Sequence, residues 1–412
     1  MSISLRSALL AGALILSSGA ARAETLTLEQ AVAKAAEAAP LLKANDAAIA
    51  AARAGKVQAG VRPNPSVTVE AENFVGSGPY NVLGQAEITG MYSQPIERGG
   101  KRDARVALAE RDVGVAQASG RVTRLELAAA VERAFIDIMI ADAVEEIADY
   151  RLETERGIER EALRRVRGYK DPLFVETRAA ARVAQAEIDA DQAKAKALAA
   201  RNNLASFWSG SGEDIEVAGE FLPYRPVELK LAKADLSLAE AATARASAAV
   251  TVEQSRAVQD YTVSGGARFL RGTNDVALVA GITIPLGRFD RNQGNIERAQ
   301  AERLQTELIT EANRLERLRR LASLRAEADA ARTRADALMA EVYPRTIKTL
   351  AQVREGYNRG GFTFRDVQDG ADAILAVQEQ WLEAMNQYRD TQTEIDRLTG
   401  RFDDAAAVEA KP

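Results

Sequence analysis

DYTVSGGARFLRGTNDVALVAGITI, residues 260–284, decides the fold class because its side chains alternate in character. Alternation with a period of two is typical of a β-strand that has two different faces. Residues 276–284 repeat the pattern after RGTND at 271–275, which is turn-like, so the stretch predicts a β-hairpin over 260–285. One face of its first strand consists of Tyr261, Val263, Gly265, Ala267 and Phe269.

A second, weaker hairpin is predicted over 66–95. Its strands, 66–75 and 84–92, lie on either side of the turn-like GSGPYNV. All four strands have about the length of a tilted strand that crosses a bilayer. Two ordinary soluble hairpins fit the strand pattern equally well. The aromatic residues suited to a membrane interface are Tyr80, Tyr92, Tyr261 and Phe269.

Each hairpin is followed by a long helix, predicted over roughly 100–167 and 291–355. At 1.5 Å per residue each helix spans about 100 Å. Pro344 is expected to bend the second one. Tight turns at 167–174 and 355–362 then reverse the chain into shorter return helices. Heptad packing of the second helix is indicated by Leu321, Leu324, Ala328, Ala331, Ala335, Leu338 and Val342.

The same unit occurs twice in the chain, with matches about 190 residues apart. We therefore predict a first repeat over 24–207 and a second over 228–400, joined by an irregular connector at 208–227. The tail 401–412 is predicted to be disordered. The matched positions are Pro95 with Pro285, 109–111 with 301–303, Gly168-Tyr169 with Gly356-Tyr357, and Phe174 with Phe364.

Residues 1–23 have a positive start, a short apolar run and a small-x-small end, which predicts a cleaved secretory signal peptide. The net charge of −5 includes two arginines of this segment, so the charge after cleavage is −7, and such a balance disfavours nucleic acid as a partner. The chain has no Cys and no His, which excludes disulfides, thiolate or imidazole metal sites, and Ser-His or Cys-His catalysis. We expect no cofactor, no metal site and no enzyme activity.

Four strands are too few to close a membrane barrel, and open strand edges are not tolerated in lipid. Several copies would have to share one barrel, and three copies supply 12 strands, within the usual range. The predicted fold class is mostly α with a small β part. In a trimer it forms a long α-helical barrel and a 12-stranded transmembrane β-barrel, a channel-tunnel. Periodicity alone does not fix the number three.

The layout resembles the TolC family of outer-membrane factors over about 24–400. The resemblance rests on TLTLEQAVAKAAEAAP, RPNPSVTVEAE, both strand hairpins and GYNRGGFTFRDVQDGAD. QPIERGGKRDAR and ITIPLGRFDRNQGNIERA are similar to the cobalt–zinc–cadmium (CzcC-like) branch. This resemblance implies an outer-membrane homotrimer with its helical barrel in the periplasm. It also implies a periplasmic adaptor (membrane fusion protein) and an inner-membrane pump of the resistance–nodulation–division class as partners.

The same resemblance implies a periplasmic gate at the helix tips, lined by an acidic pair that matches Asp366 and Asp369. Their spacing of three residues directs both carboxylates the same way along a helix. In a trimer they form two acidic rings that favour cations, and crowding is expected to raise their pKa values. Asp372 lies outside the matched pattern and is a candidate extension of the acidic face.

The expected tip and adaptor contacts are Gly168, Tyr169, Gly356, Tyr357, Gly360, Gly361 and Phe362. The glycines most simply permit backbone turns. Phe362 stands where the family often has a basic gate residue. Phe174 and Phe362 therefore suggest an apolar constriction, although simple packing under the turn explains them equally well.

The resemblance implies a passive exit duct of a tripartite efflux pump, with divalent heavy-metal cations as the expected cargo. The alternatives are the same duct for multidrug efflux or type I protein secretion, and a soluble periplasmic coiled-coil scaffold. A glycosidase-like pair of acids is disfavoured because the acids have the spacing of solvated helix faces. The transported ion, the partner proteins and the resting state of the gate cannot be read from the sequence.

Overall fold

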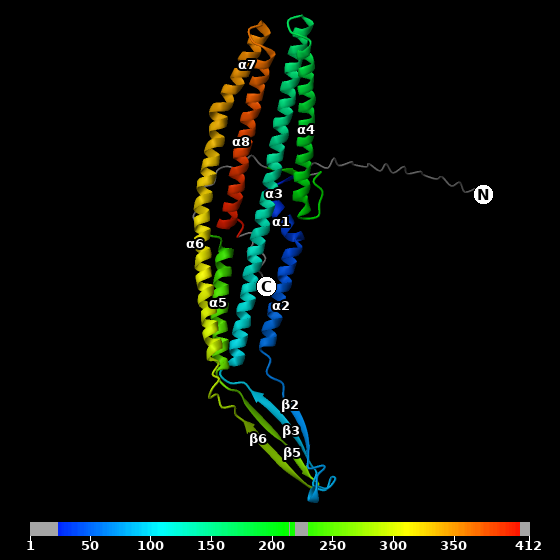
Figure 1. Ribbon diagram of the computed structural model, residues 1–412, viewed down its shortest axis with the longest axis vertical. Helices are drawn as coiled ribbons and strands as arrows, with labels where there is room; N and C mark the ends of the chain where they lie inside the picture. Colours follow the sequence, from blue (N-terminus) through cyan, green and yellow to red (C-terminus); the bar gives the residue numbers. More distant parts are fainter. Residues whose placement is uncertain (1–23, 214, 219–229, 404–412) are drawn as a thin grey trace, which may run out of the picture.

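The protein is described by a computed structural model that covers residues 24–213, 215–218 and 230–403. The predicted signal peptide, half of the connector (214 and 219–227) and residues 404–412 lie outside these residues. The molecule is a long rod of helices with a small sheet at one end and two helix tips at the other (Figure 1). This shape follows from helices that run for many turns without a breaker.

The two halves have the same order of elements: helix, two strands, a long helix and a return helix. The first half consists of α1 (Leu28–Ala38), α2 (Pro40–Ala59), β2 (Ser66–Glu72), β3 (Glu87–Ile96), α3 (Lys101–Arg167) and α4 (Phe174–Ser206). The second half consists of α5 (Lys233–Arg256), β5 (Tyr261–Leu270), β6 (Asp275–Thr283), α6 (Gln293–Ala337), a π-turn (Leu338–Val342), α7 (Tyr343–Arg359) and α8 (Phe364–Thr399). Two short parallel strands, β1 (Glu24–Leu26) and β4 (Ile215–Val217), pair at mid-length.

The main sheet is antiparallel, in the order β2-β3-β5-β6, so β2 and β6 are its two edges. The register pairs Val69 with Gly90, Gly90 with Ala267, and Ala267 with Leu278, which places apolar residues of all four strands on one face. The opposite face carries polar residues such as Glu72, Glu87 and Arg268. Leu278 is 91% exposed in the single chain. The sheet therefore has an apolar face that this chain leaves uncovered.

The first helical segment is interrupted at Pro40, where α1 ends and α2 begins. Thr27 and Gln30 form a capping box at the start of α1. Ala39, the residue before the proline, has extended backbone angles because proline disfavours the helical region for its predecessor. Proline then occupies the first turn of α2, where its missing N–H costs nothing.

The second long helix contains a π-turn at Leu338–Val342, immediately before Pro344. Proline cannot donate to the carbonyl four residues earlier, and a π-turn is a common way to absorb such a defect. α6, the π-turn and α7 contain 45, 5 and 17 residues, so this arm matches the 67 residues of α3. The predicted heptad positions are buried up to Leu338, whereas Val342 is 37% exposed. The extra residue of the π-turn rotates the apolar stripe at that point.

Three apolar clusters hold the helices together. One lies at mid-length around α1, α3 and α4, one lies between α6 and α8, and one lies near the tips. Phe402 is buried in the mid-length cluster and Arg401 bonds to Glu132 and Asp396, so the expected disordered tail does not begin at 401. None of the described helices is both long and apolar enough to cross a membrane.

Candidate functional site at the helix tips

The two tip turns differ although their sequences match. α3 ends at Arg167, and six residues separate it from α4. Tyr169 lies in this turn with a positive φ of 55° and is 98% exposed. α7 continues through its matched Gly356-Tyr357 pair to Arg359, so Tyr357 lies inside a helix and is only 1% exposed. The Tyr357 ring is therefore packed inside in the single chain, and the expected contact of this residue with a partner stays a prediction.

Two of the four tip glycines have a clear structural role. Gly360 has a φ of 85° and ends α7 in the left-handed conformation, which glycine adopts without strain. A Cβ at Gly356 would lie 2.2 Å from the Phe362 ring, so this glycine makes room for that side chain. Gly168 has ordinary negative φ, and Gly361 is not among the residues with positive φ. Only Gly360 thus fits the expectation that these glycines permit a turn through unusual backbone angles.

Three side chains join the tips of the two helical hairpins, and we call Arg165, Asp171 and Tyr357 the tip cluster. Arg165 donates from Nε to Asp171 Oδ2 at 2.9 Å and from Nη1 to the Tyr357 carbonyl at 2.6 Å. Its guanidinium also lies 4.3 Å from the centre of the Tyr357 ring. The Tyr357 hydroxyl donates to the Asp171 carboxylate. Arg165 and Asp171 are mostly buried, which strengthens these contacts relative to water.

The titration of the tip cluster follows from this geometry. Hydrogen bonding from Arg165 lowers the pKa of Asp171 from its ordinary value. Burial raises the pKa of Tyr357, and its hydrogen bond to Asp171 raises it further. Both shifts favour the charge states that the cluster needs, a carboxylate and a neutral phenol. Sequence reasoning missed Arg165 and Asp171 because their shared partner, Tyr357, lies more than 180 residues later in the chain.

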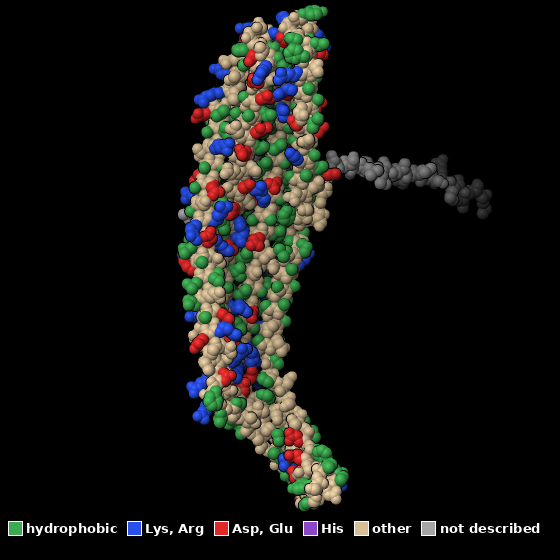
Figure 2. Space-filling model, in the orientation of Figure 1, with side chains coloured by type: hydrophobic (Ala, Val, Ile, Leu, Met, Phe, Trp, Pro, Cys, Tyr) green, Lys and Arg blue, Asp and Glu red, His purple; other side chains and the backbone are tan. Residues whose placement is uncertain are grey.

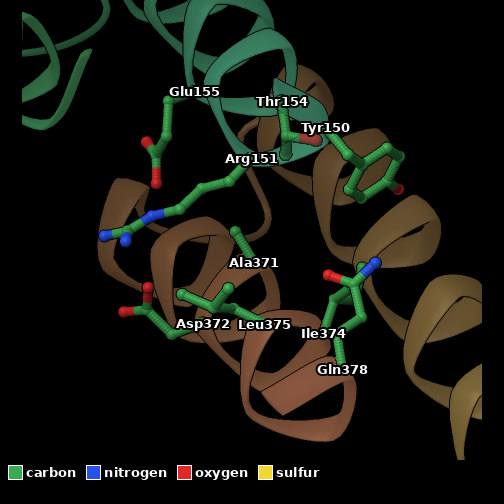
Figure 3. Close-up of a pocket in the computed structure, with 9 residues that line it drawn as sticks. All are labelled: Tyr150, Arg151, Thr154, Glu155, Ala371, Asp372, Ile374, Leu375 and Gln378. Atoms are coloured by element: carbon green, nitrogen blue, oxygen red, sulfur yellow. The ribbon is translucent and has the colours of Figure 1, made fainter. Parts of the chain in front are cut away.

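Two further ionic contacts join the hairpins below the tip cluster. Arg354 on α7 donates to Glu161 on α3. Arg182 on α4 donates from Nε to Glu155 on α3 at 2.9 Å and from Nη1 to Asp372 on α8 at 3.3 Å. Figure 3 shows Glu155 and Asp372 extending from α3 and α8 beside a small hollow between the hairpins. Asp372 therefore forms an ion pair with Arg182 and does not extend the acidic face of α8 as a free carboxylate.

Asp366 serves as a helix cap in the single chain. Its carboxylate accepts hydrogen bonds from the Thr363 backbone N–H and hydroxyl, both at 2.7 Å, in a capping box at the start of α8. Hydrogen bonding from the Thr363 side chain lowers the pKa of Asp366, whereas the ring hypothesis expects a raised one. Asp369 is exposed and lies 3.9 Å from Arg365. Both acids are on the expected helix. Asp366 caps that helix, whereas Asp369 makes an exposed ion pair with Arg365 and does not take part in the cap.

Gln368 lies between these two acids and faces the interior. It is 2% exposed, and neither its Oε1 nor its Nε2 has a hydrogen-bond partner among the described residues. Burial of an unpaired amide costs free energy. The tip is therefore packed less favourably than an apolar side chain at 368 would allow.

The two phenylalanines at the tips are both largely exposed. Phe174 opens α4 and is 64% exposed, and Phe362 is 48% exposed although one edge packs on Gly356. They belong to different helical hairpins, and neither is part of the buried apolar cluster near the tips. Among the described residues there is also no group of three acids that could hold a metal ion.

Comparisons with known proteins agree with this architecture. A family model described as outer membrane efflux protein matches residues 31–210 and 226–401, which are the two halves of the chain. The cobalt-zinc-cadmium resistance protein CzcC of Cupriavidus metallidurans is 32% identical over 386 residues, 91% of this chain and 90% of that protein. The nickel-cobalt-cadmium resistance protein NccC of Alcaligenes xylosoxydans is 28% identical over 63% of this chain and 61% of that protein.

Solved structures show the same fold. The outer membrane protein VceC of Vibrio cholerae superposes with a TM-score of 0.73 and 19% identity, covering 90% of this chain and 96% of that one. CusC, whose structures concern folding and transmembrane channel formation, gives a TM-score of 0.73 and 14% identity, covering 90% of this chain and 91% of that one. At these identities the likeness establishes the arrangement of helices and strands alone.

Proposed function

Because the chain belongs to the outer membrane efflux protein family, we propose that it is the exit duct of a tripartite efflux pump for divalent heavy-metal cations. Three copies form the duct, a periplasmic adaptor contacts the helix tips, and an inner-membrane pump of the resistance–nodulation–division class supplies the energy. The observation that carries the proposal is the four-stranded sheet with one apolar face and two unpaired edges at the end of helices about 100 Å long.

The edges of the sheet suit a shared barrel. Three antiparallel pairings separate β2 from β6, so the two edge strands run in opposite directions. Pairing of β6 with β2 of another copy therefore continues the antiparallel sheet. Closure satisfies the edge hydrogen bonds that lipid cannot satisfy. The apolar face then contacts lipid, and the polar face with Glu72, Glu87 and Arg268 lines the lumen.

The helix tips suit a gate that is held shut by polar contacts. The tip cluster and the pairs Arg354–Glu161 and Arg182–Asp372 fasten the second hairpin to the first. Opening requires the hairpins to separate, which exchanges these contacts for water. Each hydrogen bond to a charged group contributes only about 1.5–3 kcal/mol net, so a partner that binds the separated tips is able to shift the balance.

Metal cations are the proposed cargo because of the resistance proteins that this chain resembles over most of its length. The chain has no His and no Cys, so cations pass as weakly held hydrated ions, and selection belongs to the pump. Asp366 and Asp369 are proposed to favour cations at the entrance. Drug efflux or protein secretion through the same duct is the alternative.

Metal tolerance of a deletion strain tests this function. We expect loss of tolerance to one or more of zinc, cobalt, cadmium, nickel and copper, restored by the intact gene. Unchanged tolerance to all five metals, with greater sensitivity to organic drugs, assigns the duct to drug efflux instead.

A further inference from the structure

A groove of about 560 Å³ lies between α3 and α7 near the tips. Its walls carry four arginines and one acid, the acid being Glu161, which already pairs with Arg354. Figure 2 shows Lys and Arg side chains gathered near the helix tips. The lining arginines are Arg160, Arg164, Arg167 and Arg354.

Three of these arginines have no ion pair among the described residues. Arg160, Arg164 and Arg167 are exposed and follow one another at intervals of four and three residues on α3, so they form one stripe. Positive charge near a helix C-terminus is stabilised by the macrodipole, and this explains Arg164 and Arg167 in the last turn. Arg160 lies about two turns from the end, where that effect has faded.

Two arginine side chains come together at the floor of the groove. A Cβ at Gly157 would lie 3.5 Å from Nη2 of Arg354 and 3.8 Å from Nη2 of Arg160, so both guanidinium groups converge over this glycine. Arg354 donates to the Glu161 carboxylate, whereas Arg160 has no ion pair among the described residues. Like charges at this separation repel each other. Negative charge that enters the groove reduces this repulsion.

We propose that this groove binds an acidic helical segment of a periplasmic protein partner, with its carboxylates on Arg160, Arg164 and Arg167. The proposal deepens the proposed function, because it assigns a chemistry to the contact between the tips and the adaptor. Arginine suits this role because its planar guanidinium binds a carboxylate through two parallel hydrogen bonds.

The stripe also defines a register for the partner. Seven residues of helix separate Arg160 from Arg167, which is about 10.5 Å along the axis. A helix that lies along α3 and carries Glu at the same intervals of four and three presents its carboxylates at the same distances. A helix with the same number of acids at other intervals places at least one of them out of reach.

Binding of synthetic peptides to the full-length protein in detergent tests the inference. The probes are alanine-based helical peptides with Glu at intervals of four and three, with Gln at the same positions, and with the same Glu residues at scrambled intervals. We expect fluorescence anisotropy to show binding of the first peptide, at least about tenfold weaker binding of the other two, and weakening as salt is raised.

A matched pair of variants locates the binding. The variant R160E/R164E/R167E reverses the stripe, and R53E/R121E/R325E makes the same change of net charge at exposed arginines without an ion pair among the described residues. We expect at least a tenfold loss of affinity in the first and no loss in the second. Arg160→Gln, which removes a single charge, replaces the triple variant if that variant fails to assemble on a native gel.

Three results overturn the inference: equal binding of the Glu and Gln peptides, equal affinity of the two triple variants, or capture of anionic-lipid vesicles through the same arginines without binding of the Glu peptide. Peptide binding does not depend on transport. A failure here therefore leaves the metal-tolerance result untouched, and a strain with normal tolerance leaves the groove chemistry untouched.

Discussion

Tyr357 on α7 donates a hydrogen bond to Asp171, which lies 186 residues earlier in the turn between α3 and α4. Arg165 completes the contact by binding the Asp171 carboxylate and the Tyr357 carbonyl. The tips of the two helical hairpins are thus joined by side chains that are largely buried. Any separation of the hairpins has to break this contact, so its strength is open to measurement.

Tyr357→Phe removes the hydroxyl and keeps the ring. We expect the packed tip to lose about 1.5 kcal/mol, because a hydrogen bond to a charged group is lost. Hydrogen exchange of the tip amides should become faster, and channel conductance in planar bilayers should rise. Tyr169→Phe is the matched control, since that side chain is 98% exposed in the other turn. Equal effects of the two variants would contradict the role of the tip cluster.

The tip cluster also predicts how tip stability depends on pH. The folded pKa of Asp171 lies below its ordinary value of 3.8, chiefly through hydrogen bonding from Arg165, so its contribution is present above about pH 4 and is lost as the pH falls through the folded value. The folded pKa of Tyr357 is raised, chiefly by burial, so its contribution is present below about pH 10 and is lost progressively above it.

Hydrogen exchange at the tip, corrected for its intrinsic pH dependence, measures this profile. We expect protection to be flat between about pH 4 and pH 10 and to fall on both sides. Asp171→Asn should reduce the acid limb, to which the capping residue Asp366 also contributes, and Tyr357→Phe should remove the alkaline limb. An acid limb of unchanged size in Asp171→Asn would assign the titration to other groups.

Replacement of Gln368 should stabilise the tip. Its amide is 2% exposed and has no partner among the described residues, so Gln368→Met removes an unpaired polar group and keeps the length of the side chain. We expect a gain of about 1–3 kcal/mol in the packed tip, seen as slower exchange and a lower conductance. Faster exchange in Gln368→Met would show that the amide has a partner in the native channel.

The two acids of the proposed gate should respond differently. Asp366 caps α8, so Asp366→Ala should cost about 1 kcal/mol of helix stability whatever its effect on ions. Asp369→Asn leaves the cap intact and is expected to lower the preference for cations. Reversal potentials in a salt gradient measure that preference. An unchanged reversal potential in Asp369→Asn, and in Asp369→Asn with Asp366→Asn, would refute the acidic rings.

Much of the fold could be predicted because its signals are local. Side-chain alternation predicted the strands, and the spacing of Leu321 to Leu338 predicted a buried helix face. The mostly helical class and the resemblance to the TolC family are confirmed by the family match and the solved structures. Each of these features depends on residues that lie close together in the sequence.

The remaining features depend on contacts across the chain. The match of Gly168-Tyr169 with Gly356-Tyr357 suggested equivalent positions, yet α7 continues past its pair and buries Tyr357 against the other hairpin. The contact of Arg165 and Asp171 with Tyr357 was hidden because it joins residues about 190 positions apart in the sequence. Phe402 was assigned to a tail because only the folded chain shows the apolar cluster that receives it. The roles of Asp366 and Asp369 in conduction stay predictions.

The most direct measurement of the central claim is disulfide cross-linking between β2 and β6 in a chain that has no cysteine of its own. Two intervening strands separate these edges by about 14 Å within one chain, beyond the reach of a disulfide. Cysteine at Val69 would be combined in turn with cysteine at Val276, Leu278, Ala280 or Ile282, which lie on the same face. The account predicts that at least one pair gives a covalent trimer on oxidation in the membrane. Monomers alone for every pair, in protein that remains folded, would contradict it.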